Sequence, residues 1–218
     1  VVLDLVAGHT SIEHEWFKQS CKAERNQYTD WYVWTSSVWE RGLAHMPPVR
    51  GMAERNAGYV PNFFYFQPAL NYGFANPDPD YPWQQPVDAP GPQAVRQELK
   101  NIMKFWLDMG ADGFRVDMAA SLVKNDPGSR MNIKLWQEMR AWMEANYPEA
   151  ILMSEWSYPE RAIQAGFHID FFIHFGTTGY TSLFRKNSGR GMGSNRYAFS
   201  FFDKAGLGNI TEFTDDFL

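Results

Sequence analysis

Cysteine is nearly absent from this sequence of 218 residues, which contains Cys21 alone. A lone cysteine forms no intramolecular disulfide and builds no cysteine metal site. Long apolar runs are also lacking, since none reaches the roughly 18 residues of a membrane-spanning helix. Lysine and arginine do not cluster, and the formal net charge is −5, which argues against an electrostatic footprint for nucleic acid. We therefore expect neither a membrane span nor a nucleic-acid partner, and the oligomeric state stays open.

Hydrophobic residues, in contrast, make up 44% of the chain and aromatic residues 17%, including 9 tryptophans. This share suffices for a sizeable core, so general disorder is not expected. Aromatic rings also stack on the apolar faces of sugars. Composition alone favours core filling over sugar binding, and the sequence leaves both roles open for four tryptophans: Trp16, Trp31, Trp34 and Trp39.

Four apolar runs have the composition of buried parallel strands: residues 1–6, 113–116, 150–153 and 169–173. Apolar residues at helical spacing over 95–106 and 135–143 predict a helix before the second run and another before the third. Pro92 is placed where proline is tolerated at a helix start, and Gly110 where glycine ends one. The alternation predicts βαβ units and a parallel sheet.

The stretch of residues 10–90 interrupts this alternation. It is rich in Trp, Tyr, Pro and Asn, and helical periodicity is weak after a first short segment. Residues 76–82, with the sequence NPDPDYP, are typical of a loop. An insertion of this length after the carboxyl end of a strand would lie over the active face of a barrel.

Charged residues stand at the predicted strand ends, where parallel α/β folds gather their functional groups. They are Asp4 with His9, Arg115 with Asp117, and Glu155. Glycoside hydrolysis requires two carboxyl groups that flank the bond to be broken, and two successive strand ends can supply them. Arg115 is two residues before Asp117, so it points to the same face and would favour the ionised carboxylate.

Each of these strand-end residues also has a structural, non-catalytic interpretation. An Asp that ends a strand is often the cap of the next helix or a turn former. Glu155 could be a surface residue, and Arg115 could pair with a structural carboxylate. Spacing alone leaves these alternatives beside the catalytic one.

Four motifs in order are more specific. Residues 4–11, DLVAGHTS, resemble the first signature of the α-amylase family, D-x-V-x-N-H. Residues 113–117, GFRVD, resemble the second, G-F-R-x-D, which holds the nucleophile. Residues 154–156, SEW, resemble the third, which holds the acid/base. Residues 67–71, QPALN, resemble the Q-P-D-L-N segment of the oligo-1,6-glucosidase and α-glucosidase branch.

The resemblance implies an α/β fold, a (β/α)8 TIM-barrel catalytic domain of which only about strands 3–6 are present. Residues 1–9 would form barrel strand 3, and residues 10–90 an irregular inserted domain. Residues 91–218 would run from barrel helix 3 through the segment after strand 6. Four strands cannot close an eight-stranded barrel, so we expect a fragment of the enzyme, inactive alone.

The resemblance also implies roles for individual residues. Asp117 would be the nucleophile and Glu155 the acid/base, while Arg115 would hold Asp117 ionised. His9 would hydrogen-bond a hydroxyl of the sugar, and Asp4 would brace the arginine. The implied function is that of a retaining glycoside hydrolase that cleaves α-glucosidic bonds of starch-derived oligosaccharides. A transglycosylase or isomerase of the same family, handling trehalose or sucrose, and a non-catalytic sugar-binding relative remain alternatives.

The chain also departs from the family pattern. The fourth signature, N-H-D, is absent, and Asp215 and Asp216 lack the histidine that would precede its carboxylate. The Lys-His pair that many amylases carry after the nucleophile is replaced by Ala120 and Ser121, which argues against a typical endo-acting amylase. Met118 occupies the position at which the family tunes linkage preference, and α-1,4 and α-1,6 both stay open.

The usual structural calcium of the family would bind at positions that are Gly8, Ala69 and Ser121 here. Calcium prefers oxygen ligands, and the two side-chain oxygens of that site are lost. The sequence therefore predicts no cofactor and no metal at this site.

Overall fold

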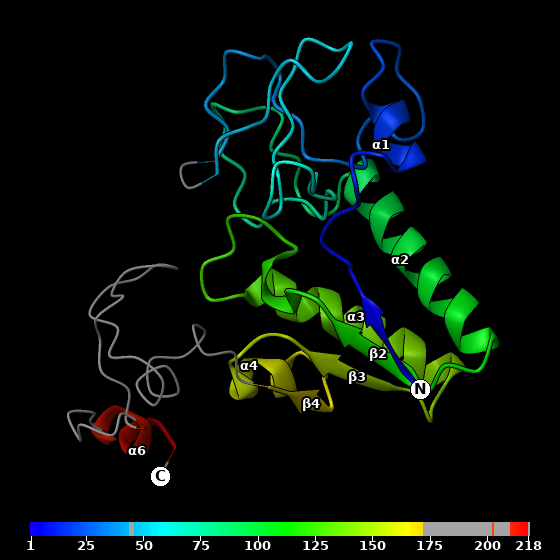
Figure 1. Cartoon of the computed structure of the whole chain (residues 1–218), viewed down its shortest axis with the longest axis vertical. Helices are drawn as coiled ribbons and strands as arrows, with labels where there is room; N and C mark the ends of the chain where they lie inside the picture. Colours follow the sequence, from blue (N-terminus) through cyan, green and yellow to red (C-terminus); the bar gives the residue numbers. More distant parts are fainter. Residues whose placement is uncertain (44–45, 172–201, 203–209, 218) are drawn as a thin grey trace.

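Four parallel strands form one sheet in the computed structural model, which describes residues 1–43, 46–171, 202 and 210–217 (Figure 1). Adjacent strands follow the order of the chain. They are β1 (Val2–Leu5), β2 (Gly113–Val116), β3 (Ile151–Ser154) and β4 (Ile169–Asp170). The predicted parallel sheet is confirmed, although β3 begins one residue later than expected. Residues 172 and 173 of the fourth predicted run are outside the described part of the chain.

Two long helices alternate with these strands, as predicted. Helix α2 (Pro90–Asp108) precedes β2, and α3 (Arg130–Asn146) precedes β3. Pro92 lies in the first turn of α2 and is buried, where its missing N–H leaves no helical hydrogen bond unmade. Gly110, just after the helix, has φ +95°, a conformation that glycine adopts without steric cost.

Shorter helices complete the described elements. The sequence pattern did not predict η1 (Ala119–Ser121) and α4 (Pro159–Gln164), each shorter than two helical turns. At six residues or fewer, such segments present too few positions for a helical period to be recognised. A further helix, α6 (Thr211–Phe217), lies near the end of the described chain.

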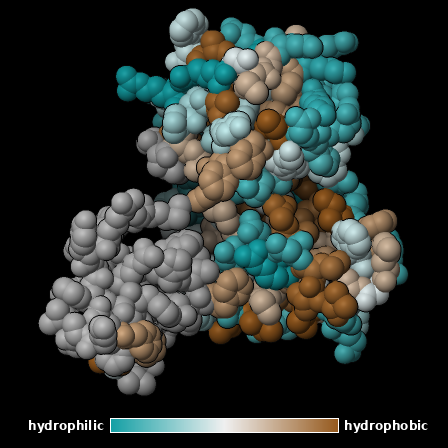
Figure 2. Space-filling view, viewed as in Figure 1, coloured by the Kyte–Doolittle hydropathy of each residue, from teal (hydrophilic) through white to brown (hydrophobic). Residues whose placement is uncertain are grey.

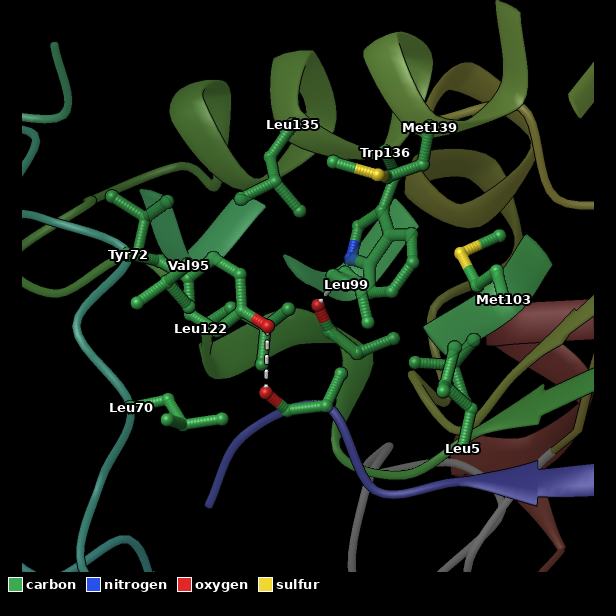
Figure 3. Close-up of a cluster of buried hydrophobic side chains, with 14 of the residues drawn as sticks. Leu5, Leu70, Tyr72, Val95, Leu99, Met103, Leu122, Leu135, Trp136 and Met139 are labelled. Atoms are coloured by element: carbon green, nitrogen blue, oxygen red, sulfur yellow. Dashed lines mark hydrogen bonds between the residues drawn. The ribbon is translucent and has the colours of Figure 1, made fainter. Parts of the chain in front are cut away.

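The core lies between the sheet and helices α2 and α3 (Figure 3). Two aromatic residues within it have polar groups that find backbone partners. The Tyr72 hydroxyl donates to the carbonyl of Ala7 at 2.8 Å, and Trp136 Nε1 donates to the carbonyl of Ala119 at 2.9 Å. Both side chains are almost fully buried. Each hydrogen bond therefore fixes a loop at the carboxyl edge of the sheet without leaving a polar group unpaired.

The segment between β1 and α2 begins with α1 (Glu15–Ser20) and continues through isolated β-bridges. Its interior is aromatic: Phe17 stacks on Trp34 with centroids 5.7 Å apart and meets Tyr59 edge to face. Bridges from His9 to Ala69 and from Phe74 to Lys124 join this segment to the loops that follow β1 and β2. It thus lies beside the carboxyl edge of the sheet (Figure 1).

The four tryptophans whose role the sequence left open lie in different environments. Trp34 is 5% exposed and belongs to the core. Trp16 and Trp31 are partly buried and meet edge to face, with centroids 4.9 Å apart. Trp39 is 87% exposed. Packing explains Trp34, and the exposed Trp39 ring does not contribute to the core.

The outer side of β1 is apolar and partly uncovered. A cavity of about 180 Å³ lies between β1 and α2, lined by residues that include Val6 and Trp106. Both side chains are more than two-fifths exposed, and Figure 2 shows hydrophobic residues gathered over this region. Among the helices of the described residues, none has the length and apolar character needed to cross a membrane.

Candidate active site

Asp117 and Glu155 are held one strand apart by the hydrogen bonds of the sheet. The N–H of Asp117 donates to the carbonyl of Leu5 at 3.0 Å, and the N–H of Glu155 donates to the carbonyl of Val116 at 3.0 Å. Each residue directly follows its strand, β2 or β3. Parallel pairing therefore brings both carboxylates to the same edge, as the sequence predicted.

Arg115 connects the charged residues of this edge. Its Nη1 is 2.6 Å from Asp4 Oδ1 and 3.1 Å from Asp117 Oδ1, and its Nη2 is 2.8 Å from Glu155 Oε2. The structure thus brings together four of the five predicted site residues around one guanidinium. Because guanidinium stays protonated and presents several fixed donors, it can neutralise and orient the carboxylates together.

Glu155 has a second donor besides Arg115. The backbone N–H of Met118 donates to Oε2 at 3.0 Å, from a residue with left-handed φ and ψ of 46° and 43°. Burial raises the pKa of Glu155, the Met118 N–H and Arg115 oppose that rise, and nearby Asp117 adds to it. The net direction is upward, so Glu155 retains a proton at higher pH than an ordinary glutamate.

His9 is linked to this group through Asn62. Its Nδ1 lies 3.2 Å from Asn62 Nδ2, which also contacts Met118 Sδ at 3.6 Å. Burial lowers the pKa of His9, the charge of Asp117 opposes this, and Lys124 adds to the lowering. The imidazole therefore favours its neutral form, which can both donate and accept a hydrogen bond.

Asn62 is a residue of the site that sequence reasoning missed. It is buried, and it contacts His9 and Met118 across 53 and 56 positions of the chain. No local pattern singles it out, because it stands between a proline and an aromatic run. Only the fold, by placing residues 60–69 against the loop after β1, gives Asn62 its role.

A lysine lies beside Ser121, one of the three positions at which the resemblance implies the calcium site of the family. Lys124 Nζ donates to the Ser121 carbonyl at 2.7 Å and to Asn62 Oδ1 at 3.4 Å. Burial lowers the pKa of Lys124 to about 8. A Cβ added at Gly8 would approach Asn62 Nδ2 to 2.9 Å, and Ala69 offers no side-chain oxygen. These residues do not fit the oxygen cage that calcium prefers.

A large cavity of about 970 Å³ opens beside Met118. It extends between the loop after β2 and the segment that precedes α2. Its volume is in the upper range of small-molecule sites, and its walls mix polar and apolar side chains. The residues that line it include Asn62, Asp78, Tyr81, Met118, Lys124 and Asn125. The cavity therefore lies beside the reacting carboxylates without being lined by them, and Met118, the residue after Asp117, forms part of its wall.

The family model of the alpha amylase catalytic domain matches residues 1–170 of this chain. An oligo-1,6-glucosidase of Bacillus sp. (strain F5) is 33% identical over 129 residues, which cover 57% of this chain and 22% of that protein. A trehalose synthase of Pimelobacter sp. (strain R48) is 31% identical over 166 residues, which cover 71% and 26%. This chain thus spans about a quarter or less of the length of these curated relatives.

Among solved structures, Eubacterium rectale Amy13B superposes with a TM-score of 0.60 at 23% identity. The superposition covers 86% of this chain and 35% of that one. The four parallel strands with their helices are accordingly part of a (β/α)8 barrel. Since the matched family model includes all four strands and the relatives include oligo-1,6-glucosidases, this chain belongs to the α-amylase family, in its oligo-1,6-glucosidase and α-glucosidase branch.

Proposed function

We propose that this chain supplies the reacting carboxylate pair of a retaining α-glucoside hydrolase. One observation carries the proposal: Asp117 and Glu155 follow adjacent strands and share Arg115, with the pKa of Glu155 raised. Such a pair offers an ionised carboxylate and a protonated carboxyl group side by side. Double displacement requires this combination.

In this proposal the proton of Glu155 is on the oxygen that has no positively polarised donor beside it. Oε2 accepts from both the Met118 N–H and the Arg115 guanidinium, so Oε1 is the oxygen that carries the proton. Glu155 gives this proton to the glycosidic oxygen while Asp117 attacks the anomeric carbon and forms a β-linked glycosyl-enzyme. Glu155 then takes a proton from water, which attacks the same carbon. Two inversions retain the α configuration.

Neighbouring residues bind and orient the sugar in this proposal. Arg115 pairs with Asp117 and orients it, and Asp4 holds the outer end of the guanidinium. The neutral His9 imidazole, oriented by Asn62, hydrogen-bonds a hydroxyl of the sugar. Oligosaccharides derived from starch are the proposed substrates, with the leaving sugar in the cavity beside Met118.

Transfer to a second sugar is the other candidate activity. It is favoured by the similarity to a trehalose synthase over 71% of this chain. The first step would be the same, but a sugar hydroxyl instead of water would give its proton to Glu155. The cavity beside Met118 is large enough for such an acceptor. Product analysis with maltose as substrate separates the two activities, because hydrolysis yields glucose and transfer yields a new disaccharide or longer product.

We also propose that calcium does not bind between Gly8, Ala69 and Ser121. The Lys124 ammonium donates to the carbonyl of Ser121, which is one of these three positions. A fixed positive charge at this position would repel a divalent cation and occupy its oxygen partners.

Substitution of the nucleophile tests the main proposal. In an active enzyme that contains this chain, Asp117→Asn should abolish turnover of aryl α-glucosides. Asp112→Asn is the matched control, because Asp112 stands just before β2, at the opposite end of the strand that precedes Asp117. Substantial activity in the Asp117 variant, or a β anomer as the first product by NMR, would contradict the mechanism.

A further inference from the structure

Asp170 ends β4 and touches the segment that carries Glu155. Its Oδ1 accepts from Ser154 Oγ at 2.7 Å and from the Trp156 N–H at 3.0 Å. Its Oδ2 accepts from the Tyr158 N–H at 2.9 Å. The three donors thus come from the residues one before, one after and three after Glu155. Neither the sequence motifs nor the reacting group around Arg115 includes Asp170.

The three hydrogen bonds hold the turn that carries Glu155. β3 ends at Ser154, so the ladder with β4 stops at the Ser154–Asp170 pair. Ser157, within the turn, has φ +59°, which is unusual for a residue with a side chain. A carboxylate that accepts from backbone N–H groups forms charge-assisted hydrogen bonds, stronger than neutral ones. Asp170 therefore replaces the missing ladder with a stronger local support.

Glu155 is held from two sides as a result. On the side of β2, its N–H donates to the carbonyl of Val116, the residue before the nucleophile. On the side of β4, Asp170 binds the residues that flank it. In the part of the chain that the structure describes, no salt bridge joins Asp170 to a basic side chain. The Asp170 carboxylate therefore interacts with the donors of this turn.

We propose that Asp170 is a positioning residue that sets where the Glu155 carboxyl group delivers its proton. The inference rests on the proposed function of Glu155 as acid/base. Protonation of the leaving group is sensitive to position, since a displacement of about 1 Å can cost about a hundredfold in rate. Asp170 itself does not touch the sugar and acts through the backbone on both sides of Glu155.

The test compares substrates that differ in their need for an acid. Phenyl α-glucoside releases a poor leaving group that must be protonated, whereas α-glucosyl fluoride needs little help. In an active enzyme containing this chain, Asp170→Asn should lower kcat/KM for the phenyl glucoside by about tenfold to a hundredfold. Its kcat/KM for the fluoride should fall by less than about threefold. A loss of folded protein would instead lower both values equally.

Asp126→Asn is the matched control for loss of a structural carboxylate. Asp126 is also partly buried, and its Oδ2 accepts three hydrogen bonds, from the N–H groups of Met131 and Asn132 and from Asn132 Nδ2. It precedes α3 and contacts neither reacting carboxylate. Its substitution should change both substrates by the same factor.

Glu155→Gln separates a failure of this inference from a failure of the proposed function. If Glu155→Gln shows no preference for the fluoride, the acid/base assignment is wrong. If it does, while Asp170→Asn lowers both substrates equally or neither, Asp170 is only structural. Should Asp170→Asn fail to fold, Ser154→Ala removes a single donor to Asp170, and an equal effect on both substrates in that variant overturns the inference.

Discussion

Arg115 is the residue on which the electrostatics of the site depend. One guanidinium lies within 3.1 Å of carboxylate oxygens from Asp4, Asp117 and Glu155. Without it, three acidic groups would share a small volume, and each would resist ionisation of the others. With it, the three carboxyl groups share one cation, while burial favours the neutral form of Glu155. The raised pKa of Glu155 thus reflects burial and the nearby Asp117, which outweigh the opposing effect of Arg115 and the Met118 N–H.

The coupling between the two carboxyl groups can be measured directly. The charge of Asp117 adds to the raised pKa of Glu155, so Asp117→Asn should lower that pKa. Titration of the labelled Glu155 carboxyl carbon by NMR measures the change, and no turnover is needed. Asp112→Asn, at the far end of β2, should leave the pKa of Glu155 where it was. An unchanged pKa in Asp117→Asn would contradict the inferred proximity.

The same shift predicts the pH dependence of activity. Glu155 must be protonated to donate, and its pKa in the folded enzyme is raised. In an active enzyme containing this chain, kcat/KM should therefore fall as pH rises through that pKa, at higher pH than for an ordinary glutamate. The fall should be marked for phenyl α-glucoside and weak for α-glucosyl fluoride, which needs little help from the acid. An equally marked fall with both substrates would belong to another group.

At the scale of elements, the register of β2 and β3 aligns the pair. Gly113 pairs with Ile151 and has φ +151°. A Cβ at this position would overlap the carbonyl oxygen of Ile151. The first residue of the G-F-R-V-D motif is thus a glycine because β3 approaches its backbone closely.

Gly113→Ala should therefore destabilise the protein by about 1–3 kcal/mol, the range typical of overpacked cores. Thermal or urea unfolding measures the loss. Gly110→Ala is the control, because Gly110 also has a positive φ but open space where a Cβ would stand. Its loss should reflect the strained backbone conformation alone, about 1 kcal/mol. Equal losses of stability in the two variants would show that the close approach of β3 is not the reason for glycine at position 113.

The sequence predicted those elements that have a local pattern. Runs of apolar residues marked the strands, and the motif after each strand located Asp117 and Glu155. The contacts made by Asn62, Lys124 and Asp170 could not be predicted in this way. The Asn62–Lys124 hydrogen bond joins positions 62 residues apart, and Asp170 reaches back 12 to 16 residues. Such contacts depend on how loops meet at the edge of the sheet. The residues that make them are not spaced at any regular interval in the sequence.

At the scale of the whole molecule, β1 is an edge strand. In the described residues it pairs only with β2, and Val2 and Val6 are 41% and 45% exposed. Exposed apolar edges of this kind promote association between chains. A barrel of eight strands has no such edge.

The 218-residue chain expressed by itself should therefore self-associate and bind a hydrophobic dye. Light scattering and dye fluorescence measure the two effects. Val2→Lys places a charge on the edge and should reduce both. Glu24→Lys, an exposed change in the loop after α1, should not. A monodisperse chain that binds no dye would contradict the prediction.

Stability should also be independent of calcium at the site near Lys124. A chelator should leave the Tm unchanged, whereas Lys124→Met should lower it, because the Ser121 carbonyl and Asn62 Oδ1 lose their donor. Differential scanning fluorimetry measures both effects. Lys134→Met, on the surface of α3, controls for removal of a lysine. A chelator-dependent drop in Tm that added calcium reverses would overturn the assignment for this site.

A positive charge on a lysine side chain and a metal ion bound from solution depend on different conditions. A bound ion stabilises a fold in proportion to the logarithm of its free concentration, so a protein that relies on it is weakened by dilution, competing chelators or a calcium-poor compartment. The amine of Lys124 is always present at one copy per chain. Its dependence is on pH instead: because burial lowers its pKa to about 8, alkaline conditions discharge it. By linkage, a pKa lowered in the folded state means that the free energy of unfolding rises as pH rises from about 8 towards the ordinary lysine value of 10.5. The lysine thus replaces a dependence on calcium concentration with a dependence on pH of this sign.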